Sequence, residues 1–245
     1  MNSLQKKWYI KSPQLHLQNE LSIALDISPT LSQLLVNRGI TDVEQANCFL
    51  NPTLSKMSDP SKIAGIIKAY DRLLEAIASK EKVLVFGDYD VDGLTSTSLM
   101  INFLTDAGLE SNFLIPNRID TGYGLKEAMI NDIVKYNCSL VVTVDCGIKS
   151  IKEVDILKGL GIDVIITDHH QPDSEIPAAC AVVNPKLGSP PAALDLAGVG
   201  VVFKLLQLLS RQIFNEDYIY SMLDLVALGT VADVVPLFGD NRILV

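Results

Sequence analysis

Several carboxylates and two imidazoles follow short apolar runs in this sequence, a placement that could bind metal ions. The residues concerned are Asp88, Asp90, Asp92, Asp145, Asp168, His169, His170 and Asp233. So many carboxylates close together repel one another unless a cation compensates their charge. Aspartate oxygens with one or two histidine nitrogens suit Mn²⁺ or Mg²⁺ better than a metal that prefers thiolates. The set is large enough for two ions that share a bridging carboxylate, an arrangement that recurs in phosphoester hydrolysis.

Each of these motifs alone also has an ordinary structural interpretation. The alternate aspartates from Asp88 to Asp92 could form a solvated loop or a calcium loop, although a predicted strand precedes them where a calcium loop follows a helix. The His169–His170 pair could be a turn, and Asp145 could cap a helix. The occurrence of all three motifs after predicted strands of one chain favours a shared site over three unrelated features.

The elements that position these residues change in character near residue 80. Residues 20–80 have a helical pattern, and we expect residues 1–80 to form a helical segment that packs on the core. We expect residues 81–245 to form an α/β domain, because short β-rich runs alternate with helical stretches. The predicted strands are residues 83–86, 112–115, 140–144, 163–166 and 181–183. The alternation predicts right-handed βαβ units and a mostly parallel sheet with helices on both faces.

The ends of these strands account for the placement of the candidate ligands. The first, third and fourth predicted strands end just before Asp88, Asp145 and Asp168, respectively. Ligands bind at the carboxyl ends of the strands in open parallel sheets. Asp233 follows the apolar run Leu223–Val231 and could close the same site.

The composition of the chain is that of an ordinary globular protein. It has 245 residues, of which 48% are hydrophobic and 20% charged, and four cysteines that form no Cys-x-x-Cys pair. This excludes a disordered or disulfide-stapled chain, a zinc knuckle and a redox motif. The longest apolar stretch, Leu196–Leu209, contains Lys204 and is shorter than the roughly 20 residues of a membrane span. Because the sequence starts without a secretion signal, we expect a cytoplasmic protein with no membrane partner.

Acidic residues dominate the predicted α/β domain. The net charge of the chain is −9, and residues 83–245 hold 21 acidic and 10 basic side chains. A protein that handles polyanions normally needs lysine and arginine to bind phosphates. The charge alone leaves two interpretations: the domain avoids anions, or its acids surround divalent cations that supply the attraction. The clustering of the aspartates after the strands favours the second interpretation.

An ordered set of sequence blocks resembles the DHH phosphoesterase superfamily, over most of the chain from about Leu31 to Val245. The blocks are residues 87–96, 116–118 with 122–125, 144–148, 168–170, 183–186, 197–204 and 227–237. Asp-His-His alone is a weak signal, but the ordered set is highly specific. Within the superfamily the chain is most similar to exonucleases specific for single-stranded DNA. The resemblance implies a 5′-to-3′ exonuclease of DNA repair and recombination, with single-stranded DNA and other repair and recombination proteins as partners.

The resemblance also implies two divalent cations, Mn²⁺ or Mg²⁺, that orient a hydroxide for in-line attack on phosphorus. The implied ligands of the first ion are Asp88 and Asp90. The implied ligands of the second ion are Asp92, His169 and Asp233. Asp145 is expected to bridge the two ions. The implied catalytic residues are Asp145, His169 and His170.

Further residues are expected to contact the substrate or to support those that do. The implied substrate contacts are Asn117, Arg118, His170 and Lys204. His170 is expected to contact the scissile phosphate. The alternative for Lys204 is that its side chain extends to solvent and does not contact a phosphate. Asp168 is expected to orient the histidine pair through hydrogen bonds. Gly198 and Gly200 are expected to open a helix. Their amides bind an anion, or their small size lets the helix pack closely; both interpretations stay open.

Two departures distinguish the chain within the superfamily. Members that hydrolyse pyrophosphate, cyclic dinucleotides or short oligonucleotides usually open the first motif with histidine, whereas this chain has Asp88. The exonucleases continue into a DHH-associated domain and an oligonucleotide-binding domain, both of which we expect to be absent here. Two alternatives therefore stand beside the exonuclease. One is a small-substrate phosphoesterase for oligonucleotides or pyrophosphate, and the other is an inactive DHH-like scaffold module, which would have lost metal ligands.

Overall fold

The computed structural model of the chain describes residues 9–116 and 124–245. It divides into two compact units, Met1–Lys56 and Met57–Val245. The first unit contains the helices α1 (Leu15–Leu25), α2 (Pro29–Asn37) and α3 (Val43–Leu50). These helices enclose a small core of their own, made of Leu21, Leu35, Val36, Ile40 and Ala46.

The division between the units falls earlier than the expected boundary near residue 80. Helix α4 (Ile66–Ser79) lies in the second unit, where its buried Ile66, Ala69 and Leu73 join the core on the sheet. An amphipathic helix needs an apolar surface to cover its stripe, and the sheet provides that surface for α4. The expected packing of the N-terminal segment on the core stays a prediction for the first unit.

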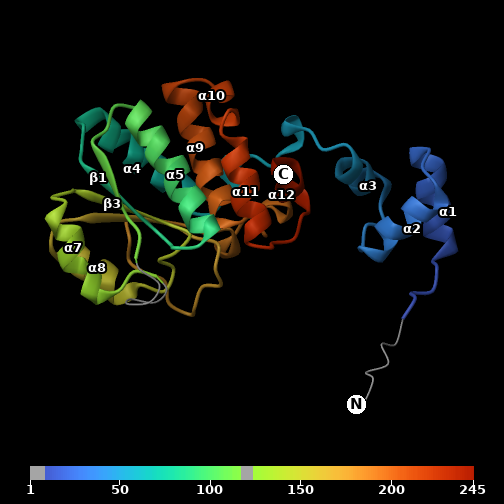
Figure 1. Cartoon of the computed structure of the whole chain (residues 1–245), viewed down its shortest axis with the longest axis horizontal. Coiled ribbons are helices and arrows are strands. Elements are labelled where there is room, and N and C mark those ends of the chain that lie inside the picture. Colours follow the sequence, from blue (N-terminus) through green and yellow to red (C-terminus); the bar gives the residue numbers. More distant parts are fainter. Residues whose placement is uncertain (1–8, 117–123) are drawn as a thin grey trace, which may run out of the picture. The chain divides into compact units, whose positions relative to one another are not determined.

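Five parallel strands form the sheet of the second unit (Figure 1). The strands are β1 (Val83–Gly87), β2 (Ser111–Leu114), β3 (Leu140–Val144), β4 (Asp163–Thr167) and β5 (Ala181–Val183). Their spatial order is β2-β1-β3-β4-β5, and every pair of neighbours is parallel. Each predicted strand matches one of these within a residue at either end. The predicted fold class is therefore confirmed.

Helices cover both faces of this sheet (Figure 1). α4, α5 (Val91–Asp106) and α9 (Gly198–Ile213) pack on one face, and α7 (Ile130–Lys135) and α8 (Ile151–Gly159) pack on the other. The other helices described are α10 (Glu216–Tyr220), α11 (Leu223–Ala232) and α12 (Gly239–Leu244). The short 3-10 helices are Leu54–Lys56, Pro60–Lys62, Glu127–Met129, Pro185–Leu187 and Pro191–Ala193. Within the described ranges, no helix has the length and hydropathy that crossing a membrane requires.

The side chains of the strands alternate between two cores. Val83 and Val85 of β1 lie in the core on the side of α5 and α9, whereas Leu84 and Phe86 lie in the core on the side of α7 and α8. This alternation follows from the two-residue repeat of a β-strand. Because both faces are covered, the strands are apolar along their length, and the polar candidate ligands stand at their ends.

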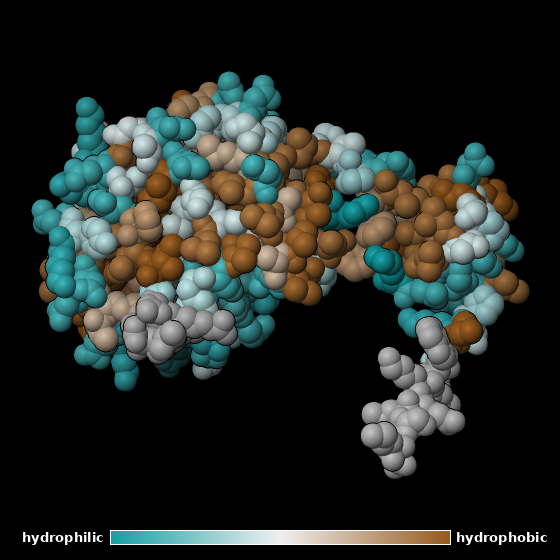
Figure 2. Space-filling model, in the orientation of Figure 1, coloured by the Kyte–Doolittle hydropathy of each residue, from teal (hydrophilic) through white to brown (hydrophobic). Residues whose placement is uncertain are grey.

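Helix α11 leaves an apolar surface exposed. Leu228 and Val231 are 56% and 53% exposed, and Val234, just after the helix, is 84% exposed. Figure 2 shows hydrophobic surface over this helix. We call these three residues the α11 surface. It lies beside Asp233, the residue that caps the C-terminus of α11.

Candidate metal centre

The register of the parallel strands places three candidate residues at neighbouring positions. Gly87 of β1 pairs with Val144 of β3, and Val144 pairs with Thr167 of β4. The residues that directly follow these three are Asp88, Asp145 and Asp168. They therefore leave the sheet side by side at its carboxyl edge, where the sequence places the site.

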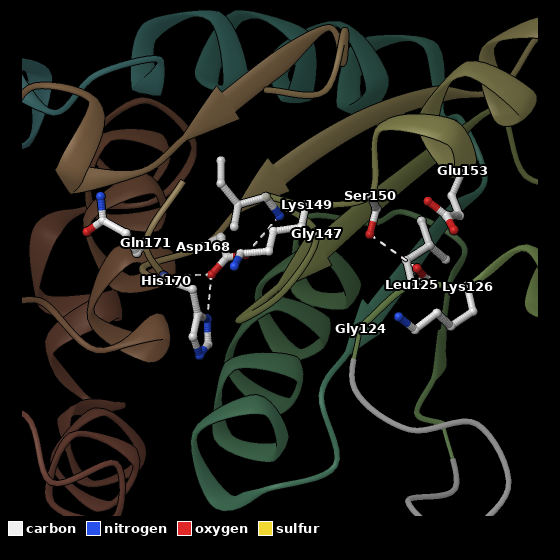
Figure 3. A pocket seen from close by; sticks show the side chains of 11 residues that line it. Gly124, Leu125, Lys126, Gly147, Lys149, Ser150, Glu153, Asp168, His170 and Gln171 are labelled. Atoms are coloured by element: carbon white, nitrogen blue, oxygen red, sulfur yellow. Dashed lines mark hydrogen bonds and ion pairs between the residues drawn. The ribbon is translucent and has the colours of Figure 1, made fainter. Parts of the chain in front are cut away.

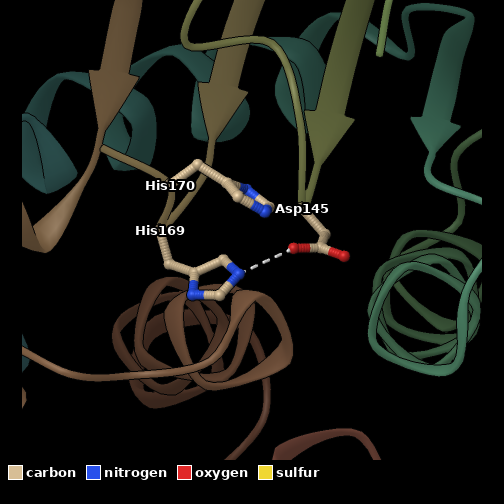
Figure 4. Close-up of side chains that lie close together, drawn as sticks. All are labelled: Asp145, His169 and His170. Atoms are coloured by element: carbon tan, nitrogen blue, oxygen red, sulfur yellow. Dashed lines mark ion pairs between the residues drawn. The ribbon is translucent and has the colours of Figure 1, made fainter. Parts of the chain in front are cut away.

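Asp145 leaves β3 with an uncommon backbone conformation. Its φ of 59° lies in the left-handed region, which few residues other than glycine adopt. Its backbone N–H donates a hydrogen bond to the carbonyl oxygen of Thr167 at 2.9 Å, so the turn is tied to the end of β4. Asp145 Oδ1 lies 3.1 Å from Nε2 of His169 (Figure 4). Backbone strain of this kind clusters at functional sites.

Three groups of side chains each bring their ligand atoms within 4.8 Å of one another. The groups are Asp88–Asp90–Asp145, Asp92–His169–Asp233 and Asp145–His169–His170. Asp145 and His169 each belong to two groups, so the three groups form one continuous cluster. His169 Nε2 also lies 3.8 Å from Asp92 Oδ2 and 3.6 Å from Asp233 Oδ2. All six residues predicted as metal ligands therefore lie in this cluster, with Asp145 where the two predicted ligand sets meet.

The start of α5 separates two of the aspartates. Asp90 is the N-cap of the helix, and its Oδ1 accepts the backbone N–H of Gly93 at 3.0 Å. Asp92 lies in the first turn and is buried, and its carboxylate accepts backbone hydrogen bonds from Gly198 and Val199 at the start of α9. The alternate spacing thus gives one exposed and one buried carboxylate in the cluster.

The pKa values of the buried carboxylates are raised. Burial, with repulsion from Asp92 and Asp90, raises the pKa of Asp145 to about 10. Burial raises the pKa of Asp92 to about 6, against the opposing effect of His169. Burial also raises the pKa values of Asp88 and Asp233. Protein groups alone therefore leave the negative charge of the cluster uncompensated, and its ionised form needs a cation.

Among the buried ligand atoms of the cluster, Asp88 Oδ1 and His169 Nε2 make no hydrogen bond of regular geometry with the described residues, although Asp145 Oδ1 lies 3.1 Å from the histidine nitrogen. A buried polar atom without a hydrogen bond is costly, and both of these atoms can donate an electron pair to a metal. Five aspartates and one histidine form a donor set that suits Mn²⁺ or Mg²⁺. The residues present therefore fit divalent cations.

Asp168 holds the second histidine in place. Its Oδ1 lies 2.8 Å from Nδ1 of His170 and accepts the backbone N–H groups of both histidines, while its Oδ2 accepts the N–H of Ile148. Burial works against ionisation of Asp168, but its hydrogen bonds, first those from His170, lower its pKa. Burial likewise works against protonation of His170, but the hydrogen bond to Asp168 raises its pKa. This geometry agrees with the orienting role predicted for Asp168.

Asn184 supports the same histidine, and the sequence patterns did not assign it a role. It follows β5 and is fully buried. Its side-chain nitrogen donates to the carbonyl oxygen of His170 at 2.9 Å, and its side-chain oxygen accepts the N–H of Lys186 at 2.9 Å. The signal that could have identified it is the one that identified the aspartates, a polar residue directly after a predicted strand.

A cavity of about 380 Å³ adjoins His170 (Figure 3). His170 lines it next to the cluster, Leu125 and Ile148 give it apolar walls, and Lys126 and Lys149 line it with basic side chains. Its volume lies in the range of small-molecule binding sites. The cluster is therefore continuous with a space that can hold part of a substrate.

The predicted substrate contact of Lys204 is wrong. The side chain is fully buried, and its Nζ lies 2.9 Å from Oδ2 of Asp240 and 2.7 Å from the carbonyl oxygen of Ser58. The ammonium group therefore reaches neither a phosphate nor solvent, because the buried ion pair encloses it. Of the other three predicted contacts, Asn117 and Arg118 lie outside the described residues, and the contact of His170 with substrate stays a prediction as well.

Comparison with known proteins gives a family match over most of the second unit. Residues 82–230 match the DHH family, N-terminal domain. The chain is 40% identical over 245 residues to the single-stranded-DNA-specific exonuclease RecJ of Bacillus subtilis. The match covers 100% of this chain and 30% of that protein. It is 34% identical over 240 residues to RecJ of Thermus thermophilus, with 98% of this chain and 34% of that protein covered. The chain thus spans about a third of the length of these curated relatives.

Two solved structures with similar folds contain manganese. A crystal structure of exonuclease RecJ bound to manganese has a TM-score of 0.69 at 37% identity, covering 74% of this chain and 46% of that chain. The structure of RecJ in complex with Mn²⁺ from Thermus thermophilus has a TM-score of 0.79 at 32% identity, covering 96% of this chain and 33% of that chain. These proteins bind a cation that also suits the donor set found here.

Proposed function

Because this chain belongs to the DHH family, we propose that it is a metal-dependent phosphodiesterase that hydrolyses single-stranded DNA from its 5′ end. Similarity to RecJ over the whole chain supports single-stranded DNA as the substrate. We further propose a role in DNA repair and recombination. The chain spans about a third of that relative, and the activity is proposed for the 245 residues themselves.

One observation carries the proposal: two sets of ligand atoms meet at Asp145 on the carboxyl edge of the sheet. We propose that they hold two divalent cations, Mn²⁺ or Mg²⁺, with Asp145 shared between them. The first set is Asp88, Asp90 and Asp145, and the second is Asp92, His169, Asp233 and Asp145. When bound, two such cations activate the attacking water and stabilise the charge that develops on the reacting phosphate.

The protein's own groups position the substrate and the ligands. The carboxylate of Asp145 is buried and its backbone is tied to Thr167, which keeps the shared ligand in place. We assign His170 to the scissile phosphate, to which its protonated ring donates a charge-assisted hydrogen bond. Asp168 and Asn184 hold that residue in position. Water adds to phosphorus and the bond to the 3′ oxygen of the terminal nucleotide breaks, so a 5′-mononucleotide leaves.

Two features beside the cluster support a single strand as the substrate. The cavity next to His170 has room for a nucleotide, and its Lys126 and Lys149 carry positive charge of the kind that phosphates attract. The α11 surface is apolar, and the faces of bases are exposed in an unstacked single strand but covered in a duplex. An unstacked strand can therefore make favourable contacts at the cavity beside His170 and at the α11 surface beside Asp233.

The two alternatives have weaker support. An inactive scaffold module would have lost metal ligands, whereas all six expected ligands lie together in this chain. A small-substrate phosphoesterase fits the same cluster, but the similar proteins named above are exonucleases. Substrate preference therefore separates the proposal from the phosphoesterase alternative.

The test is hydrolysis by the purified 245-residue chain in Mn²⁺, with Asp145→Asn as the inactive control. A 3′-labelled single strand, the same strand in a duplex, a dinucleotide and pyrophosphate are compared at equal concentration. We expect the single strand to shorten stepwise from its 5′ end and to release mononucleotides, faster than the duplex. Shortening from the 3′ end, or hydrolysis of pyrophosphate without cleavage of the strand, would contradict the proposal.

A further inference from the structure

Asp92, one of the proposed ligands, also binds the start of helix α9. Its Oδ2 accepts the backbone N–H of Gly198 at 2.6 Å, and its Oδ1 accepts the N–H of Val199 at 2.8 Å. The carboxylate is almost fully buried, so these contacts lie inside the protein. The sequence leaves open whether the amides at the start of α9 bind an anion. In the structure they do bind one, and this anion is the carboxylate of Asp92, a side chain of the chain itself.

Gly198 is also the point at which α9 approaches Asp145. A Cβ atom at position 198 would lie 2.6 Å from Asp145 Oδ1, 2.7 Å from its Cβ and 2.8 Å from its Cγ. All three distances are far shorter than a van der Waals contact. The backbone of Asp145 is tied to Thr167, so the Cβ atom of Asp145, which side-chain rotation does not move, cannot move aside without disturbing the end of β3.

Gly229 of α11 makes a similar approach to Asp92. A Cβ atom at this position would lie 2.3 Å from Thr95 Oγ1 and 3.1 Å from Asp92 Oδ1. Asp92 is thus enclosed by α9 and α11, each of which has a glycine where it meets the cluster. The two helices define the space that the acidic side chains occupy.

We propose that Gly198 is a positioning residue of the metal centre, through which α9 sets the place of two carboxylates at once. Its N–H, together with that of Val199, holds both oxygens of Asp92. Its missing side chain leaves the space that Asp145 occupies. The inference rests on the proposed function, because both carboxylates are ligands there. Carboxylates that are already fixed lose less conformational freedom on binding a cation, so they bind it more tightly.

The test compares Gly198→Ala with the matched control Gly200→Ala. Both positions lie in the first turn of α9, so both substitutions change helix propensity in the same way. The three atoms nearest to a Cβ atom at position 200 all belong to the side chain of Leu196, and the closest, at 2.9 Å, is Cδ2, the flexible end of that side chain. Of the two substitutions, Gly198→Ala is the one whose added methyl group has an acidic side chain of the cluster, Asp145, as its nearest neighbour.

The readout is Mn²⁺ binding by isothermal titration calorimetry, with melting of each chain in EDTA to show that it is folded. We expect Gly198→Ala to weaken Mn²⁺ binding by about tenfold or more, while Gly200→Ala binds as the unmodified chain does. Equal Mn²⁺ affinity of the two variants would overturn the inference. The readout is independent of hydrolysis, so a chain that binds Mn²⁺ as expected but leaves DNA intact contradicts the proposed function alone.

If Gly198→Ala does not fold, a double variant tests whether contact between the new methyl group and Asp145 is the cause. In Gly198→Ala/Asp145→Gly, the carboxylate and the Cβ atom that the new methyl group meets are both removed. Glycine also accepts the φ of 59° at position 145. We expect the double variant to regain a cooperative melting transition in EDTA. A double variant as unstable as Gly198→Ala would overturn the inference, because contact with Asp145 would then not be the cause.

Discussion

Replacing Lys204 by methionine distinguishes a structural lysine from one that contacts the substrate. Its ammonium group is fully buried between Asp240 and the carbonyl oxygen of Ser58. Methionine keeps the apolar stem but removes the charge, so the fully buried Asp240 loses its cation. Removing one partner of a buried ion pair costs about 3–5 kcal/mol of unfolding free energy. The N–H and hydroxyl of Ser58 still bind Asp240, so we expect the lower end, about 3 kcal/mol.

The assay is thermal unfolding of the metal-free chain at pH 7, followed by circular dichroism. A loss of about 3 kcal/mol corresponds to a melting temperature about 6–12 °C lower in a domain of this size. Lys68→Met is the control, because Lys68 is exposed on α4, and we expect it to melt like the unmodified chain. The double variant Lys204→Met/Asp240→Asn should regain part of the lost stability, because it no longer buries an unpaired charge.

The same variant tests the alternative role in substrate binding. If Lys204 is structural, Lys204→Met keeps the KM for single-stranded DNA and the Mn²⁺ affinity at temperatures where it is folded. A variant that melts like the unmodified chain but has a higher KM would refute the reasoning, because the lysine would then face the substrate.

Three further predictions concern the acidic cluster. Asp145→Asn is expected to abolish hydrolysis of single-stranded DNA in Mn²⁺, because both proposed ions lose a charged ligand. Metal analysis measures the Mn²⁺ content of this variant. If the variant holds its full Mn²⁺ content and still hydrolyses DNA, Asp145 is not a shared ligand. Burial raises the pKa of Asp92 from 3.8 to about 6, so the metal-free chain should lose stability as pH rises through this range while its Mn²⁺ affinity increases. Melting in EDTA and titration calorimetry across this range measure both trends, and an affinity that does not change with pH contradicts the assignment. Asp168→Asn should lower kcat about 10–100-fold with Mn²⁺ affinity retained, because His170 loses its orienting carboxylate; an unchanged kcat would show that Asp168 has no such role.

The position of the site follows from local sequence patterns. Asp88, Asp145 and Asp168 each follow an apolar run, and parallel register brings the ends of such strands to one edge of a sheet. The number of acids at that edge then indicates a cation site, because nothing else in the predicted fold compensates their charge. These inferences need only residue types and the order of the strands.

Contacts between distant segments do not follow from such patterns. The spacing of Lys204 within its helix does not reveal that Ser58, 146 residues away, meets its ammonium group. The hydrogen bond from Gly198 to Asp92 spans 106 residues in the same way. An amphipathic pattern shows that α4 has a buried face, but it does not show which core covers that face. The tertiary structure is needed to choose among such partners.

The central claim is that Asp145 joins two cation positions. Crystals of the chain soaked in Mn²⁺ and measured at the manganese absorption edge test it most directly. We predict two anomalous peaks about 3.5–4 Å apart, one beside Asp88 and Asp90 and one beside Asp92 and His169, with Asp145 in contact with both. A single peak, or two peaks of which Asp145 touches only one, would contradict the claim.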